Sequence, residues 1–275
     1  MKQIYLFLIS IIISFQLTAQ ITIIQNGKKE ALPNMVLQVK QLDEFVNRFN
    51  YEQNFYGKKI TPEFTKQFPR GKYISLLFNN QDKRIIQNSA EYFSSIEQFI
   101  KDITDGNGQY IAKHSTHIYA VADCKLFYKG KTVKATLILN REVTKSYAKW
   151  VIRKVDATFL YLPQKENPSN SLPPNSHETD FISLKKTLDK KNNFSSITQK
   201  SFQYNQLSSF LFLISTGELK FQYVEKLKYL ILDIPNWAIA VQEYKRDSEN
   251  SGWLISNISK QDDELKKYLG IDLKN

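Results

Sequence analysis

The stretch Ile118-Tyr-Ala-Val-Ala-Asp-Cys-Lys-Leu-Phe-Tyr128 decides the fold, because apolar and polar residues alternate along it. Alternation with a period of two is typical of a half-buried β-strand. Apolar stretches at 132–142 and at about 147–162 follow, and Lys129-Gly-Lys131 supplies a hairpin turn between the first two. We therefore predict an antiparallel meander whose first strand carries these core residues: Ile118, Ala120, Ala122, Cys124, Leu126 and Tyr128.

The same pattern recurs about one hundred residues later, in the stretches 219–231, 237–244 and 252–258. A shift of 103 positions superimposes Trp150-Val-Ile on Trp253-Leu-Ile and carries Ile118 onto Phe221 without a gap. The repeat predicts two folded units, each with a sheet of its own.

Helices are expected before the first meander. Apolar residues at steps of three and four predict a helix over 34–49, and Thr61-Pro62 has the residue types of an N-cap and a first helical position. Ser94-Ser-Ile-Glu97 has the spacing of a capping box and predicts a third helix, which 105–108 ends. The apolar run 73–78 fits either a helix or a strand.

The segment 163–177 is rich in Pro, Asn and Ser and is interpreted as a linker. It divides the chain into a first domain at 20–162 and a smaller second domain at 178–275. In the second domain we predict helices at 181–188, 207–214 and 262–269. The fold class is thus α+β, with two tandem units of N-terminal helices followed by a curved antiparallel sheet.

Residues 1–19 have the features of a signal peptide: Lys2, an apolar run, and a small residue, Ala19, at the expected cleavage site. No cysteine lies near that site, so a lipoprotein is not indicated. We expect a periplasmic or secreted chain without a transmembrane segment after cleavage. The end of this leader in Ala19-Gln20 resembles exported proteins of the Bacteroidetes.

The charge of the chain limits the classes of partner that it can bind. The formal net charge is +11, but the lysines are scattered in short pairs and indicate a solvated surface, and export argues against a nucleic-acid partner. An envelope surface or an anionic glycan remains an alternative partner for these lysines.

Cys124 is the single cysteine and cannot form an intrachain disulfide, so we expect a buried apolar side chain.

Two segments follow the predicted helices and strands and place a tryptophan before an apolar pair: Lys149-Trp150-Val-Ile152 and Gly252-Trp253-Leu-Ile255. They resemble the last strand of the nuclear transport factor two-like family, which is cystatin-like in architecture. The resemblance implies a conical sheet with helices packed inside it, often around an apolar pocket. That family includes isomerases, dehydratases and many non-catalytic binding modules, so it does not select a function. None of its catalytic patterns matches this sequence.

The candidate catalytic residues are chosen only by residue type, because no catalytic motif is present. A buried carboxyl group beside a tyrosine donor would support proton transfer next to a carbonyl group, and Asp123 with Tyr119 or Asp156 with Tyr128 supply these residue types. The simpler interpretation places them on the outer face of the sheet. His114 and His117 are three residues apart on an extended strand and face opposite sides, so no metal and no cofactor is predicted.

The preferred hypothesis is an exported, non-catalytic protein that binds a partner protein or a small ligand, with any pocket expected in the first, helix-rich unit. One alternative is a small-molecule isomerase or hydrolase with a pocket carboxylate. The other is envelope or anionic-glycan binding through the lysines. The tryptophans Trp150, Trp237 and Trp253 are expected in the core. The sequence leaves the oligomeric state open.

Overall fold

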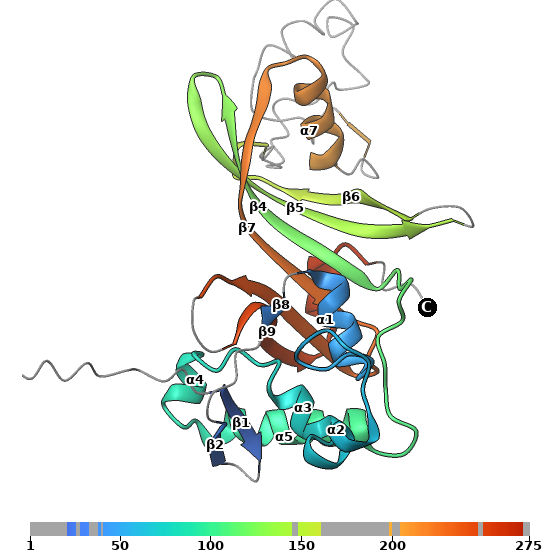
Figure 1. Cartoon of the computed structure of the whole chain (residues 1–275). Coiled ribbons are helices and arrows are strands. Elements are labelled where there is room, and N and C mark those ends of the chain that lie inside the picture. The colour runs from blue at the N-terminus through green and yellow to red at the C-terminus, as the bar shows by residue number, and fades with distance from the viewer. Residues whose placement is uncertain are drawn as a thin grey trace, which may run out of the picture. The chain divides into compact units, whose positions relative to one another are not determined.

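A computed structural model describes residues 21–25, 28–32, 38–39, 41–144, 148–160, 198–199, 204–246 and 250–271, with side chains from residue 41 onward (Figure 1). The predicted signal peptide, the linker at 163–177 and the helix at 181–188 lie outside these ranges. Within them the chain is α+β, with helices followed by an open antiparallel sheet, as the periodicity predicts.

The N-terminal part holds short strands and helices. Their bounds are β1 (Ile21–Gln25), β2 (Lys28–Leu32), β3 (Gln38–Val39), α1 (Leu42–Phe49), α2 (Pro62–Gln67), α3 (Arg70–Ser75), α4 (Lys83–Ile86) and α5 (Ala90–Thr104). β1 and β2 pair with each other in an antiparallel ladder.

The C-terminal part holds both meanders. Their bounds are β4 (Ile118–Tyr128), β5 (Lys131–Val143), β6 (Ala148–Asp156), β7 (Leu219–Ile231), β8 (Trp237–Tyr244) and β9 (Ser251–Lys260). The described residues of this part also form the 3₁₀-helix η1 (Thr158–Leu160) and the helices α7 (Gln206–Ser215) and α8 (Asp263–Tyr268).

Two tandem units with separate sheets are not confirmed, because both meanders belong to one sheet with the strand order β3-β9-β8-β7-β4-β5-β6. β4 pairs with β7, from Ile118 opposite Ile231 to Tyr128 opposite Leu219. This pairing joins the first strands of the two copies. An isolated meander would leave the edge of each first strand unpaired, and the shared ladder satisfies both edges.

The chain divides into two compact units, and neither is continuous in sequence. Unit 1 combines Met1–Ile111 with Gln242–Ile258, and unit 2 combines Ala112–Val241 with Ser259–Asn275. Each unit is described separately below.

Aromatic side chains form the core of unit 1. The rings of Phe45, Phe49 and Phe99 follow one another at centroid distances of 6.2 and 6.4 Å, and all three residues are fully buried. Phe78 meets Phe99 edge-on at 6.1 Å. These contacts tie α1 and α5 to the segment that leaves α3, so burial of aromatic rings stabilises this unit.

Three expectations for unit 1 need correction or refinement. The predicted helix over 34–49 is described as a helix only from Leu42, because Gln38 and Val39 pair in parallel with β9 instead. Such tertiary pairing overrides a helical period. The third helix begins at Ala90, since the Ser89 side chain accepts a hydrogen bond from the Tyr92 amide. The ambiguous run 73–78 ends α3 and then forms a single parallel bridge from Phe78.

The N-cap at Thr61 with Pro62 at the first helical position is confirmed, and Thr61 Oγ1 accepts a hydrogen bond from the Phe64 amide.

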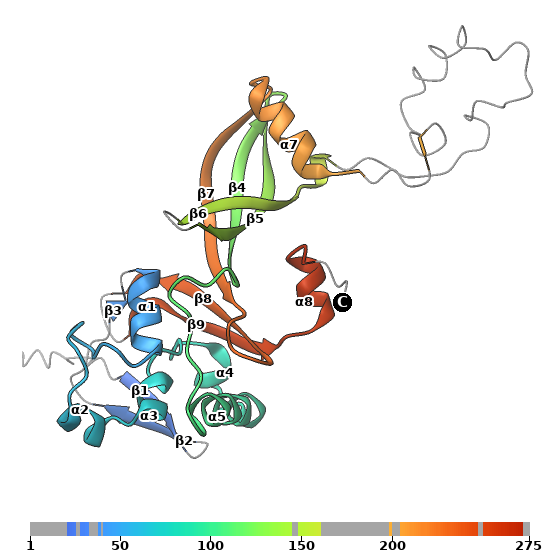
Figure 2. The ribbon, with the colours of Figure 1, turned by 90° about the vertical axis from the view of Figure 1, so that its right-hand side faces the viewer.

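The part of the sheet in unit 2 is strongly curved (Figure 2). Trp150 on β6 and Tyr229 on β7 have ring centroids 5.8 Å apart, although β4 and β5 lie between their strands. On β4, the residue opposite Tyr229 is the small Ala120, which leaves room for this approach. The ring contact across two intervening strands shows how strongly the sheet bends here.

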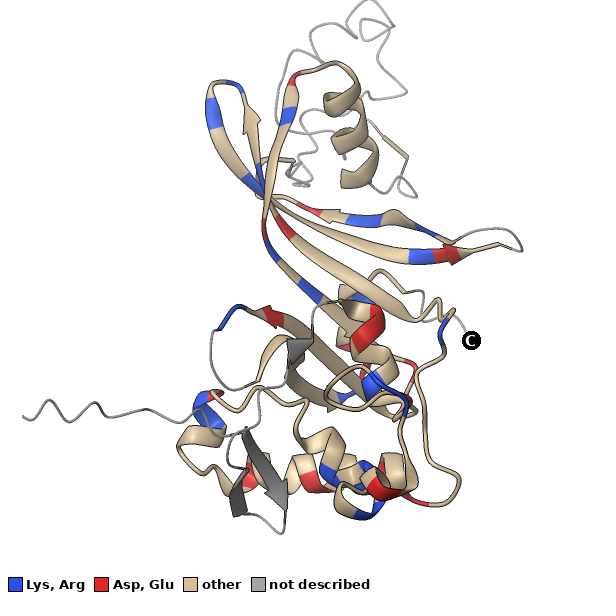
Figure 3. Ribbon diagram, viewed as in Figure 1, with Lys and Arg blue, Asp and Glu red and all other residues tan. Residues whose placement is uncertain are grey.

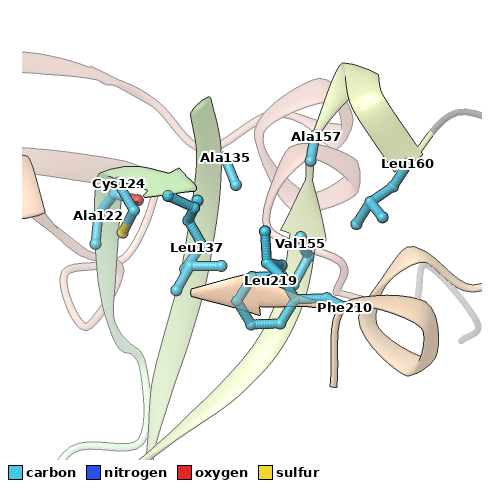
Figure 4. Close-up of a cluster of buried hydrophobic side chains, with 10 residues drawn as sticks. Ala122, Cys124, Ala135, Leu137, Val155, Ala157, Leu160, Phe210 and Leu219 are labelled. Carbon is cyan, nitrogen blue, oxygen red and sulfur yellow. Dashed lines mark hydrogen bonds between the residues drawn. The ribbon is translucent and has the colours of Figure 1, made fainter. Parts of the chain in front are cut away.

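The concave face of this sheet holds the core that the alternation predicts. Phe210 reaches from α7 toward Val155 and Leu219 (Figure 4), within a buried cluster that also contains Cys124 and Leu126. This cluster, the concave core, comprises Ala122, Cys124, Leu126, Ala135, Leu137, Val155, Ala157, Leu160, Phe210 and Leu219.

The convex face of β4 was expected to be the solvent-exposed outer face of the sheet. This expectation is wrong near the start of the strand. Tyr119 and Val121 are buried there, at 5% and 3% exposure, beside Leu269 and the partly buried Leu265 of the C-terminal helical segment. The local period cannot reveal a helix that arrives from more than 130 residues away along the chain. Within the described ranges, no helix is both long enough and apolar enough to cross a membrane.

Candidate functional site

The candidate site in unit 2 is a row of polar side chains that crosses four strands on the convex face. Asp123 is paired with Lys226 on one side and with Thr136 on the other, and Thr136 is paired with Asp156. Directly opposite residues in an antiparallel ladder share a face, so these four side chains emerge together. Strands are about 4.8 Å apart, which places the Cα atoms of the two aspartates about 10 Å apart.

A hydrogen bond and ion pairs organise this row. Thr136 Oγ1 donates to Asp123 Oδ1 at 2.8 Å. One strand position away, Glu225 lies 3.3 Å from Lys125 Nζ and 3.8 Å from Lys134 Nζ. The site therefore carries both signs of charge in close proximity, as Figure 3 shows along these strands.

An open cavity of about 490 Å³ lies over the row. Its lining contains three carboxylates, two lysines and hydroxyl groups, and the complete set is Asp123, Cys124, Lys134, Ala135, Thr136, Asp156, Ala157, Thr158, Glu225 and Lys226. Eight of these ten residues belong to the predicted first domain at 20–162, where a pocket was expected, and Glu225 and Lys226 come from the predicted second domain.

Tyr268 on α8 stands close to both aspartates. Burial raises the pKa of its hydroxyl group, and the negative charges of Asp123 and Asp156 raise it further. Lys154 Nζ donates to the Tyr268 carbonyl oxygen at 2.8 Å, and this ammonium group lies 5.7 Å from the Tyr268 ring centroid.

The predicted aspartate–tyrosine pairs do not form. Asp123 and Tyr119 share a face, but four residues along a strand separate them by about 13 Å. Tyr128 faces the concave side, where its ring lies 5.4 Å from that of Phe159, whereas Asp156 faces the convex side. The tyrosine on which the charges of both aspartates act is Tyr268 of α8, and no local sequence signal links α8 to these strands.

The histidines do not join this row. His117 Nδ1 lies 3.4 Å from Asp233 Oδ1, and the His117 side chain is largely exposed. Asp233 also accepts hydrogen bonds from the Ala112 amide and the Ser115 hydroxyl, so it holds the start of β4. In the parts of the chain that are described, no three His, Cys, Asp or Glu side chains gather as metal ligands.

A second candidate surface lies on α7 and the start of β7. We define the α7–β7 surface as Leu211, Phe212, Ile214, Phe221 and Val224, whose exposures range from 36% to 62%. Val224 and Phe221 lie opposite Cys124 and Leu126, so they share the concave side with α7. Scattered apolar residues are normal on a surface, but a group on neighbouring elements indicates a binding site.

The signal for this surface is present in the sequence. The helix reads Gln206-Leu-Ser-Ser-Phe-Leu-Phe-Leu-Ile-Ser215, and its five consecutive apolar residues Phe210–Ile214 span more than one full helical turn. Such a helix cannot bury its whole circumference against one sheet, and only Phe210 is fully buried.

Among the tryptophans, which were all expected in the core, Trp237 and Trp253 are buried, whereas Trp150 is 40% exposed.

Comparisons with protein-family models, with curated proteins and with solved structures gave no match.

Proposed function

We propose that this protein is an exported binding protein without a catalytic role, and that it binds its partner through the α7–β7 surface. The observation that carries the proposal is the placement of Phe212 and Phe221, two of the most exposed phenylalanines of the described residues, on adjacent elements of unit 2. Exposed aromatic residues are enriched where proteins bind one another.

The accessibility of this surface is tested by chromatography on a phenyl column. Leu211→Ser together with Phe212→Ser should shorten retention while the urea midpoint stays within the error of the parent chain, because exposed side chains contribute little to stability. Ile86→Ser is the matched control, since Ile86 is a 57% exposed apolar residue in unit 1. Unchanged retention of the double variant would refute this surface.

Export is tested by N-terminal sequencing of the product released by a bacterial host. Cleavage after Ala19 gives a chain that begins with Gln20. A product that retains Met1 would contradict export by this leader.

Two features support the family resemblance and the internal duplication as further parts of the proposal. The sheet of unit 2 is curved around α7, as the nuclear transport factor two-like resemblance implies. The strand order is also mirrored about the β4–β7 pair, with the second and third strands of each copy following outward. We infer that the two meanders arose from one three-stranded unit.

A second candidate function is a small-molecule isomerase or hydrolase, favoured by Asp123 and Asp156, which line one cavity and whose negative charges both act on the Tyr268 hydroxyl group. A carboxylate base and a neutral tyrosine donor are the groups that proton transfer requires. Turnover of an ester or enolisable ketone that Asp123→Asn and Tyr268→Phe both abolish would establish this function and contradict the first proposal.

The lysines support a third candidate, anionic-glycan binding, only through the net charge of +11. Retention on heparin that disappears at high salt would favour it, whereas retention equal to that of a neutral protein would exclude it.

A further inference from the structure

Among the strands that the structure describes, the N-terminal part of β7 has a neighbour on one side only. β7 contains 13 residues and β8, its other neighbour in the sheet, contains 8. The two strands are joined by the short segment 232–236, so β8 runs back along the end of β7 nearest that turn. Among the described strands, Leu219–Tyr223 therefore pairs with β4 alone and presents unpaired backbone groups at its other edge.

Side chains beside this edge are suited to an added strand. Phe221 and Val224 are 49% and 46% exposed on the concave side, and Tyr223 is 55% exposed on the convex side. Gln222 and Glu225 have no partner position in the β4 ladder, which marks two bulges. Apolar groups on both faces of an open edge would contact alternate residues of an incoming strand.

The charge around the edge selects the partner. Residues 218–226, at the start of β7, contain two lysines and two glutamates and are neutral in sum, and residues 125–134 of the β4–β5 hairpin, on the other side of β7, add four lysines and no acidic residue, so the three strands together carry a net charge of +4 here. Glu225 is already engaged by Lys125 and Lys134. Two copies of this chain would bring like charges together at such an edge, whereas an acidic strand would be attracted.

We propose that the Leu219–Tyr223 edge of β7 accepts an extended acidic segment of a partner protein as an additional β-strand. This inference rests on the proposed binding function and assigns the class of partner. Backbone hydrogen bonds supply the affinity, and the lysines select acidic residues in the partner.

Synthetic peptides test the proposal on the full chain. The probe is a fluorescein-labelled peptide of alternating Val and Glu, and its matched control alternates Val and Lys. Fluorescence anisotropy should show binding of the Val–Glu peptide about tenfold or more tighter than that of the control, with affinity that falls as salt rises.

Two further peptides distinguish strand addition from simple charge attraction. In one, the even-numbered amides of the Val–Glu peptide are N-methylated, and in the other the odd-numbered amides are. Successive amides of a strand point to opposite sides, so one methylated peptide should lose binding and the other should keep it. Equal binding of both methylated peptides would overturn the proposal.

Variants of the chain locate the site. Lys220→Glu should weaken binding of the Val–Glu peptide about tenfold, whereas Lys58→Glu, an equal change of net charge at an exposed position of unit 1, should not. Circular dichroism confirms that both variants remain folded. Equal effects of the two variants would place the site elsewhere.

A dimer detected by sedimentation without peptide and dissociated by Lys220→Glu would show that a second copy occupies the edge, which also overturns the proposal.

The strand-addition proposal and the proposed binding function of the α7–β7 surface can fail independently of each other. If no peptide binds but the Leu211→Ser, Phe212→Ser variant still loses phenyl retention, the strand partner is excluded and the α7–β7 surface stands.

Discussion

The core of unit 1 and the α7 region of unit 2 use the same apolar residue types with opposite outcomes. Phe49 and Phe99 are fully buried, whereas Phe212 is 62% exposed. In unit 1, α5 presents a single apolar stripe that neighbouring elements cover, whereas the apolar run Phe210–Ile214 of α7 spans a full helical turn and packs on one side only. Burial thus depends on how much of a helix its neighbours can cover, and the uncovered remainder is available for binding.

The largest expected effect is in the core of unit 1. Phe99→Ala should reduce the free energy of unfolding by about 4 kcal/mol, because it removes a buried ring and leaves a cavity. Urea denaturation followed by tryptophan fluorescence measures this change. A loss no larger than that of an exposed position would show that the aromatic core does not hold unit 1.

The next effect separates the two sides of α7. Phe210→Ala should cost about 3 kcal/mol, because Phe210 is 3% exposed within the concave core. Phe212→Ala, two residues away, should stay within about 0.5 kcal/mol of the parent chain. Similar losses at both positions in urea denaturation would contradict a free outer face of α7.

Cys124 reports whether α7 stays packed on the concave core. Burial raises the pKa of its thiol from 9.0 to about 11, so the stabilisation of the neutral thiol is present below pH 9 and is lost as pH rises through about 11. At pH 8 the folded chain should react with a disulfide reagent about a hundredfold more slowly than the urea-unfolded chain, because only the thiolate reacts. Rapid labelling of the folded chain would show that the core opens.

The smallest effect concerns a charge inside unit 1. Arg48 is 2% exposed, pairs with Glu44 and donates to the Phe55 carbonyl oxygen at 3.3 Å. Glu44→Gln should destabilise the chain by about 1–2 kcal/mol, because it leaves a buried charge without its counter-ion. Restored stability in the Glu44→Gln, Arg48→Met variant, measured by urea denaturation, would support this cause. No rescue would indicate that other contacts of Arg48 dominate.

Local rules predicted much of the secondary structure. The alternation of β4 is confirmed on its concave side, and the turn at Lys129 and Gly130 has φ values of 47° and 77°, as a tight hairpin requires. Thr61 caps its helix as predicted. These features depend on residues close together in sequence, so periodicity and turn chemistry are sufficient to find them.

The candidate site was only half predictable. Asp123 and Asp156 were selected as carboxylates on strands, and the ladders through Thr136 bring them to one cavity. Tyr119 and Tyr128 do not pair with them, because Tyr119 lies four residues along the strand from Asp123 and Tyr128 faces the concave side. The sequence of β4 does not encode which distant helix covers its convex face.

The sequence by itself determined the α+β class, the two meanders and the apolar run of α7, since each follows from residue order within one element. Only the tertiary structure decided that β4 pairs with β7 and that β7 extends beyond β8. Pairing between distant strands depends on which edges remain unsatisfied after local folding, and no residue pattern within a strand specifies that choice. The open edge of β7 follows from this non-local choice.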